Sequence, residues 1–133
     1  MNTFFTKINK TANTFFKNNK NDMILFFVIL LGSILSSFFL PWWVEEFIAF
    51  IAALGFGRVP YKSFLSGFFA AGLIWCILIL VKTIPNDYLL ANRVVQLFPL
   101  PNNWIYLMAL SVAIGGVLCG MASLTGVLLR RAV

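Results

Sequence analysis

Residues 23–40 read MILFFVILLGSILSSFFL and contain no charged side chain. Only Gly32 and three serines interrupt this apolar run of 18 residues, and a helix needs roughly 17–25 residues to cross the hydrocarbon core of a bilayer. The run continues through Phe38 and Phe39, beyond any small-residue cleavage site, which favours an uncleaved membrane anchor over a signal peptide. We therefore expect an integral membrane protein.

The composition of the whole chain supports the same environment. Hydrophobic residues make up 61% of the 133 residues and charged residues 11%, whereas a soluble domain carries about a quarter charged residues. So few charges cannot cover a water-facing surface. We therefore expect the lipid bilayer to be a partner of this chain. The net charge of +6 comes from basic residues beside apolar runs, where we expect it to set topology and not to bind nucleic acid.

Three further segments read as membrane spans, at about 42–57, 63–81 and 104–129. The tandem tryptophans that follow Pro41 mark a membrane–water interface, and the last segment closes at Arg130 and Arg131. The segment at 42–57 is the shortest of them. By length alone it could cross the membrane or be re-entrant.

The distribution of basic residues decides between these two topologies. If the second segment crosses, eight of the ten basic residues lie on one side, and only Lys82 and Arg93 lie opposite. If it does not cross, six of the basic residues lie on one side of the membrane and four lie on the other. The positive-inside rule prefers the first arrangement. It predicts an all-α bundle of four transmembrane helices in two hairpins, with both termini in the cytoplasm.

Two shorter segments are expected to lie outside the spans. Residues 1–22 form a basic cytoplasmic leader, which is either an amphipathic helix in the headgroup region or an unstructured polar segment. Residues 23–133 form the four-helix domain. Within it, residues at about 86–98 predict a short amphipathic interfacial helix between the third and fourth spans, because apolar side chains recur there at helical spacing and Pro99 ends the pattern.

Small residues line the fourth span at four- and three-residue steps. Within lipid, close approach of backbones over small side chains drives helix packing. The proposed packing residues are Gly67 in the third span and Ala109, Ala113, Gly116, Gly120 and Ser123 in the fourth. This face packs either inside the bundle or against a partner subunit. In the second case, Gly116→Leu or Gly120→Leu should break the association.

The polar candidates lie at the expected outer surface. Glu45 and Glu46 are either a cation or proton site at the mouth of the bundle, or two solvated acids stabilised by the dipole of the second helix. Asp87, Asn92 and Arg93 belong to the interfacial helix, where they either contact an external partner or face solvent.

No pattern of residues predicts catalysis, a metal site or a cofactor. The chain has no histidine, and the serines within the spans have no nearby base that could activate them. We therefore expect a non-catalytic accessory, assembly or scaffold subunit that packs against another membrane protein. The alternative is a small oligomeric transporter or channel. In helix number and length the chain resembles the small multidrug transporters, but residues 23–40 lack the acid that those proteins carry in their first span.

The expected location is the cytoplasmic membrane of a bacterium. The abundance of Phe, Ile, Asn and Lys suggests a bacterial genome rich in A and T, and helical spans are the form that crosses such a membrane.

Overall fold

The computed structural model describes residues 2–133, with side chains for all of these except residues 14–18. The elements are α1 (Asn2–Phe39), α2 (Val44–Phe56), α3 (Pro60–Thr83), the 3₁₀ helix η1 (Ile84–Asn86), α4 (Leu89–Val95) and α5 (Trp104–Ala132). The described residues contain helices and no strand. The prediction of an all-helical chain is confirmed.

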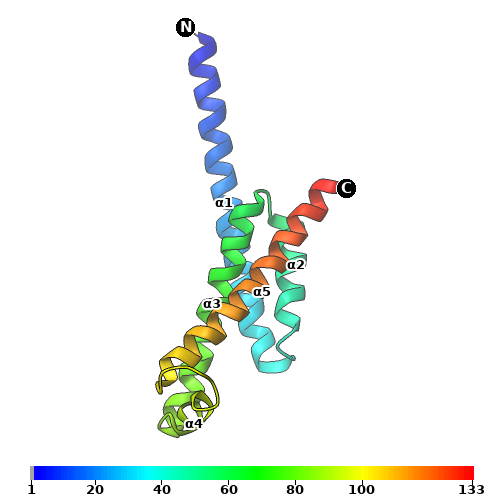
Figure 1. Cartoon of the computed structure of the whole chain (residues 1–133). Coiled ribbons are helices and arrows are strands. Elements are labelled where there is room, and N and C mark those ends of the chain that lie inside the picture. Colours follow the sequence, from blue (N-terminus) through cyan, green and yellow to red (C-terminus); the bar gives the residue numbers. More distant parts are fainter. Residues whose placement is uncertain (1) are drawn as a thin grey trace.

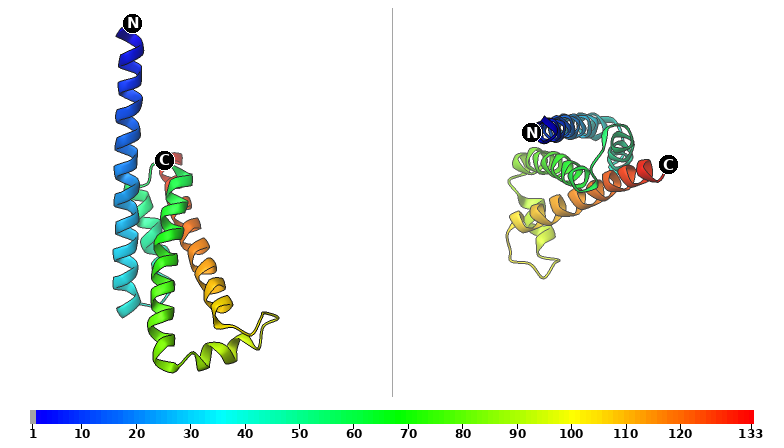
Figure 2. Two further views of the ribbon diagram at one scale, coloured as in Figure 1. Left: turned by 90° about the vertical axis from the view of Figure 1, so that its left-hand side faces the viewer. Right: turned by 90° about the horizontal axis from the view of Figure 1, so that it is seen from above.

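Helices α1, α2, α3 and α5 run alternately down and up (Figure 1). The connection between α2 and α3 lies at the same end of the bundle as the C-terminus, and α1 continues past that end toward the N-terminus (Figures 1 and 2). Helices η1 and α4 lie at the opposite end. The chain turns from α1 into α2 before the level at which α3 ends, so the last turns of α3 extend beyond the tip of the α1–α2 hairpin (Figure 2).

Three helical segments are long and apolar enough to cross a membrane: Asn19–Phe39, Pro60–Asn86 and Trp104–Ala132. Their large apolar side chains are widely exposed on the outside of the bundle, as suits a multi-pass membrane protein. Helix α2 has 13 residues and is about 20 Å long at 1.5 Å per residue. It is shorter than a hydrocarbon core of about 30 Å.

Local sequence explains where the helices begin and end. Pro60 occupies the first turn of α3, where a missing backbone N–H costs nothing. The side chain of Asn103 caps α5 by accepting a hydrogen bond from the backbone N–H of Ile105 at 3.2 Å. Gly57 ends α2, and a Cβ atom at this position would lie only 2.6 Å from the carbonyl oxygen of Ala53.

The leader and the first span form one continuous helix. Helix α1 runs from Asn2 to Phe39 without a break at residue 22. The described side chains of residues 2–20 are exposed except for that of Ala12, which is half-buried. The side chains of Phe15, Phe16 and Lys17, which belong to the expected amphipathic pattern, lie outside the described residues. We call residues 2–20 the N-terminal arm.

Within the segment expected to form one interfacial helix at 86–98, the structure has the shorter helix α4 (Leu89–Val95), and η1 ends at Asn86. Asp87 and Tyr88 adopt positive φ angles of 48° and 59°, which end η1 and precede α4. The ring of Tyr88 stacks on that of Trp104, with centroids 4.5 Å apart. This contact accompanies the left-handed backbone conformation, which helical periodicity cannot reveal.

Candidate functional site

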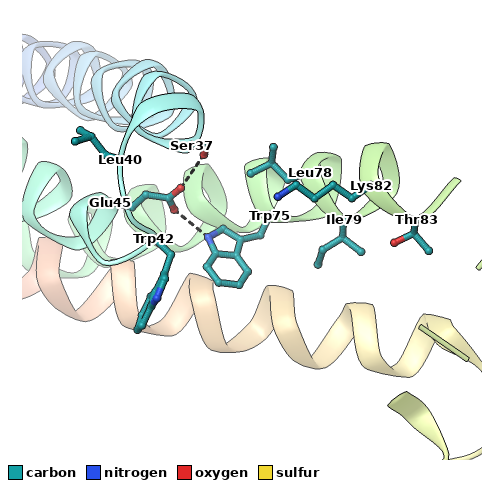
Figure 3. A pocket seen from close by; sticks show the side chains of 9 residues that line it. All are labelled: Ser37, Leu40, Trp42, Glu45, Trp75, Leu78, Ile79, Lys82 and Thr83. Carbon is teal, nitrogen blue, oxygen red and sulfur yellow. Dashed lines mark hydrogen bonds between the residues drawn. The ribbon is translucent and has the colours of Figure 1, made fainter. Parts of the chain in front are cut away.

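Glu45 is a buried acid at the start of α2, and three helices meet at its carboxylate. It lies in the first turn of α2 and is only 4% exposed. The hydroxyl of Ser37, near the end of α1, lies 3.0 Å from Oε1, and the indole N–H of Trp75 in α3 donates a hydrogen bond to Oε2 at 2.9 Å (Figure 3). The carboxylate therefore connects α1, α2 and α3.

The sequence explains this placement in simple steps. Pro41 and the two tryptophans turn the chain between α1 and α2, and the backbone N–H of Val44 bonds to the carbonyl oxygen of Pro41 at 3.1 Å. Glu45 then falls in the first helical turn, where the macrodipole stabilises a negative charge. On the other side, Gly115 of α5 makes room for the ring of Trp75, because a Cβ atom there would lie 3.0 Å from the indole.

A cavity of about 400 Å³ adjoins this carboxylate. Glu45 and the rings of Trp42 and Trp75 border it at one end, and Leu78, Ile79 and Lys82 border it along α3. Lys82 extends from α3 toward the carboxylate side of the cavity (Figure 3). Within the part of the chain that the structure describes, no ion pair joins it to Glu45. The site thus combines an acid, a base and two aromatic rings around an open volume.

The Ser37 hydroxyl can support two protonation states of the acid. Its oxygen lies 2.7 Å from the carbonyl oxygen of Ser33 and 3.0 Å from Oε1 of Glu45, but a hydroxyl has only one hydrogen to donate. If that hydrogen points to Glu45, the carboxylate is ionised and its charge is stabilised. If it points to Ser33, a protonated Glu45 can donate to Ser37. In both states each oxygen of the Glu45 carboxyl group has one hydrogen-bond partner.

Glu46 differs from its neighbour. It is half-buried, and among the described side chains its Oε2 atom is buried without a hydrogen-bond partner. Glu45 is enclosed by the bundle, so the interpretation of two solvated acids does not hold for it. The adjacent carboxylates thus occupy different environments.

The other predicted polar residues lie away from this cavity. Asp87 and Arg93 are exposed and Asn92 is half-buried. Asp87 and Arg93 border a separate open hollow beside η1 and α4. None of the three lines the cavity at Glu45.

The predicted packing residues fall into two groups. Gly67 of α3 lies against the backbone of α5, where an added Cβ atom would meet the Cys119 carbonyl oxygen at 2.8 Å and Gly120 Cα and Ser123 Cβ at 3.1 Å. Gly116 and Gly120 lie beneath the rings of Phe68 and Phe64. These residues form the contact between α3 and α5 within the chain.

Ala109 and Ala113 form the second group. They are exposed on α5, unlike the buried Gly116 and Gly120. Replacing Gly116 or Gly120 with leucine would disturb the chain's own helices, so these substitutions do not isolate a contact with another protein.

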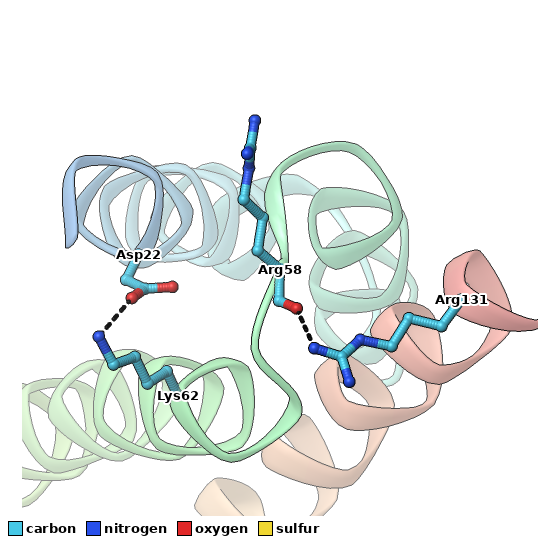
Figure 4. Close-up of polar contacts among 4 residues, drawn as sticks. All are labelled: Asp22, Arg58, Lys62 and Arg131. Atoms are coloured by element: carbon cyan, nitrogen blue, oxygen red, sulfur yellow. Dashed lines mark hydrogen bonds and ion pairs between the residues drawn. The ribbon is translucent and has the colours of Figure 1, made fainter. Parts of the chain in front are cut away.

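Basic side chains connect the helices at the end of the bundle opposite the Glu45 cavity (Figure 4). Lys62 of α3 pairs with the buried Asp22 of α1 at 3.2 Å. The guanidinium of Arg130 donates to the carbonyl oxygens of Gly55 and Gly57 at 2.9 and 3.1 Å, and Arg131 donates to that of Arg58 at 2.6 Å. The positive charge of arginine at the C-terminal end of α2 also interacts favourably with the helix dipole.

Sequence reasoning found Glu45 but not its partners. Trp75 carried a usable signal, because an indole N–H in the middle of an apolar span requires an acceptor. Ser37 carried no such signal, because serines are common in spans. Asp22, the partner of Lys62, carried none either, because it lies in a polar segment.

The chain was compared with protein-family models, curated proteins and solved structures, and none of them matches it. Among the described residues, no group of three or more potential metal ligands comes together.

Proposed function

We propose that this chain is a non-catalytic accessory subunit that crosses a bacterial cytoplasmic membrane four times, with both termini in the cytoplasm. Its N-terminal arm docks on a partner protein at the cytoplasmic surface.

The topology rests on the charges at the two ends of the bundle. Arg58, Lys62, Arg130 and Arg131 gather at the end from which the arm extends. The positive-inside rule assigns such an end to the cytoplasm. From Lys62 to Lys82 helix α3 advances 20 residues (82 − 62), or about 30 Å at 1.5 Å per residue. That distance matches the hydrocarbon core.

The short α2 fits a crossing because other helices shield it. It packs between α1 and α5, and the turn at Trp42 and the connection at Gly57 extend its 13 residues at both ends. Local thinning of the bilayer accommodates a short span at modest cost.

The arm is the observation that carries the accessory role. It continues the axis of α1 past the bundle and stands clear of the other helices (Figure 2). If the bundle axis follows the membrane normal, the arm projects about 28 Å from the membrane surface at 1.5 Å per residue. The headgroups are then out of its reach along most of its length.

The arm's composition indicates a protein surface as its occupant. Phe4 and Phe5 are 66% and 61% exposed, and Lys7 and Lys10 are exposed near them. Thr and Asn are poor helix formers, and most helical stability in proteins comes from packing an apolar face. An acidic surface with an apolar groove would supply both the packing and the opposite charge.

Arm variants in the otherwise intact chain test this proposal. Phe4→Asn with Phe5→Asn should release the partner when the protein is extracted gently from its own membrane, while the bundle stays inserted. A matched control, Asn9→Gln with Asn13→Gln, alters the polar residues of the same arm and should keep the partner. An unchanged complex in the phenylalanine variant would contradict the proposed role.

A second candidate function is a small oligomeric transporter, and Glu45 is the observation that favours it. An acid buried among helices and bordering a cavity is a functional site by default in a membrane protein, and Ser37 accommodates both of its protonation states. Flux in proteoliposomes tests this candidate. Glu45→Gln should abolish a proton-dependent flux, and flux equal to that of empty vesicles would exclude it.

A further inference from the structure

We propose that the cavity between Glu45 and Lys82 binds a phospholipid headgroup that carries a primary ammonium next to a phosphate, as in phosphatidylethanolamine. This inference concerns the far end of the bundle and does not depend on the accessory role of the arm.

The position of the cavity points to a lipid. It lies where the α1–α2 hairpin stops and α3 continues, so Leu78, Ile79 and Lys82 line it from beyond the hairpin tip (Figure 3). Trp42 is 63% exposed at its edge. Tryptophan and lysine near a span end mark the depth at which lipid headgroups lie. A volume of about 400 Å³ at this depth, open beside exposed apolar side chains, is accessible from the bilayer.

Glu45 selects for an ammonium with N–H groups. Each carboxylate oxygen accepts one protein contact, from Ser37 or from Trp75, whereas an ionised carboxylate has about four acceptor positions. A primary ammonium supplies three donors for the remaining positions, and a trimethylammonium supplies none. The indole rings of Trp42 and Trp75 border the same volume and favour a cation over their faces.

Lys82 completes the recognition. Its side chain extends toward the carboxylate side of the cavity (Figure 3). It makes no ion pair with Glu45 among the described residues. With the ammonium of the ligand at Glu45, the adjacent phosphate would lie between Glu45 and Lys82. It would form a charge-assisted hydrogen bond with Lys82. Leu78 and Ile79 then offer an apolar surface to the acyl region. An anionic lipid without an amine leaves Glu45 unmatched.

Native mass spectrometry of the full, delipidated chain in detergent tests the site with three probes: phosphatidylethanolamine, phosphatidylcholine and phosphatidylglycerol. The wild type should retain the ethanolamine lipid about tenfold better than either of the others, the ratio that one charge-assisted hydrogen bond provides. Glu45→Gln should lose this preference over the choline lipid. Lys82→Gln, at an exposed position that does not endanger folding, should bind the ethanolamine lipid about tenfold more weakly.

Arg93→Gln is the matched control, because Arg93 is an exposed basic residue outside the cavity, and this variant should behave as the wild type. Equal retention of the three lipids would overturn the proposal, and so would an unchanged preference in Glu45→Gln together with unchanged binding of the ethanolamine lipid by Lys82→Gln. The headgroup could come from a membrane lipid or from a soluble molecule, and competition with excess glycerophosphoethanolamine, which lacks acyl chains, distinguishes these two sources. The lipid should stay bound in its presence, and displacement at similar concentrations would assign the cavity to a soluble ligand and overturn the lipid assignment.

Discussion

The indole N–H of Trp75, in the middle of α3, donates a hydrogen bond to the Glu45 carboxylate in the first turn of α2 at 2.9 Å. This contact connects two helices that otherwise touch little, because α2 packs mainly on α1 and α5. It holds an ionisable carboxyl group inside a bundle whose surface is largely apolar.

Trp75→Phe should destabilise the bundle by about 1–2 kcal/mol, because it keeps an aromatic ring beside Gly115 but leaves Oε2 of Glu45 without its donor. The free energy of unfolding in mixed micelles measures this loss. Trp43→Phe is the control, since Trp43 is exposed and its ring contacts that of Phe47, a contact that phenylalanine can keep. Equal stabilities of the two variants would show that the hydrogen bond contributes nothing.

Gly67→Ala should separate α3 from α5 and cost about 1–3 kcal/mol, the usual cost of overpacking. The added methyl group would meet the backbone atoms of Cys119 and Gly120, which cannot turn aside as a flexible side chain can. Gly55→Ala is a matched control, because nothing lies within 4 Å of a Cβ atom there. Thermal unfolding in detergent should show a lower midpoint for the first variant only.

Arg130→Gln should loosen the basic end of the bundle. The substitution removes the hydrogen bonds to the carbonyl oxygens of Gly55 and Gly57, and we expect a loss of about 1 kcal/mol because the site is solvent-exposed. Faster amide exchange at residues 55–58 would locate the effect. Arg93→Gln should leave the exchange there unchanged, and equal exchange in both variants would refute the role of Arg130.

Single cysteines test whether α2 crosses the membrane. Pro41→Cys and Asn102→Cys should react with an impermeant thiol reagent from the same side, and Arg58→Cys should react from the other side. The native Cys76 and Cys119 are replaced by serine in each case. Reaction of Arg58→Cys from the same side as Pro41→Cys, with Asn102→Cys reacting from the other side, would show that α2 does not cross and would refute the four-span topology.

The helical elements were predictable because their signal is local. Apolar runs of sufficient length and the flanking Pro60 and Asn103 mark α3 and α5 within a few residues. The break at Asp87 and Tyr88 was not predictable, because the left-handed conformation coincides with a ring contact to Trp104. That partner is distant in sequence.

The candidate site was predictable only in part. Glu45 was identified as a polar candidate, but its burial depends on where α1 ends and on the room that Gly115 leaves for the indole of Trp75. Similarly, spacing along one helix identified Gly116 and Gly120 as packing residues. It could not tell that Phe64 and Phe68 of the same chain cover them.

The native mass of the protein, extracted gently from its own membrane, tests the accessory role most directly. We predict a particle that contains a second kind of polypeptide in addition to the 15.0 kDa chain. When residues 2–20 are removed, its mass should fall to that of the shortened chain alone or of its homomer. A wild-type particle that contains only copies of this chain would contradict the accessory role, and it would direct the next measurements to flux through the site at Glu45.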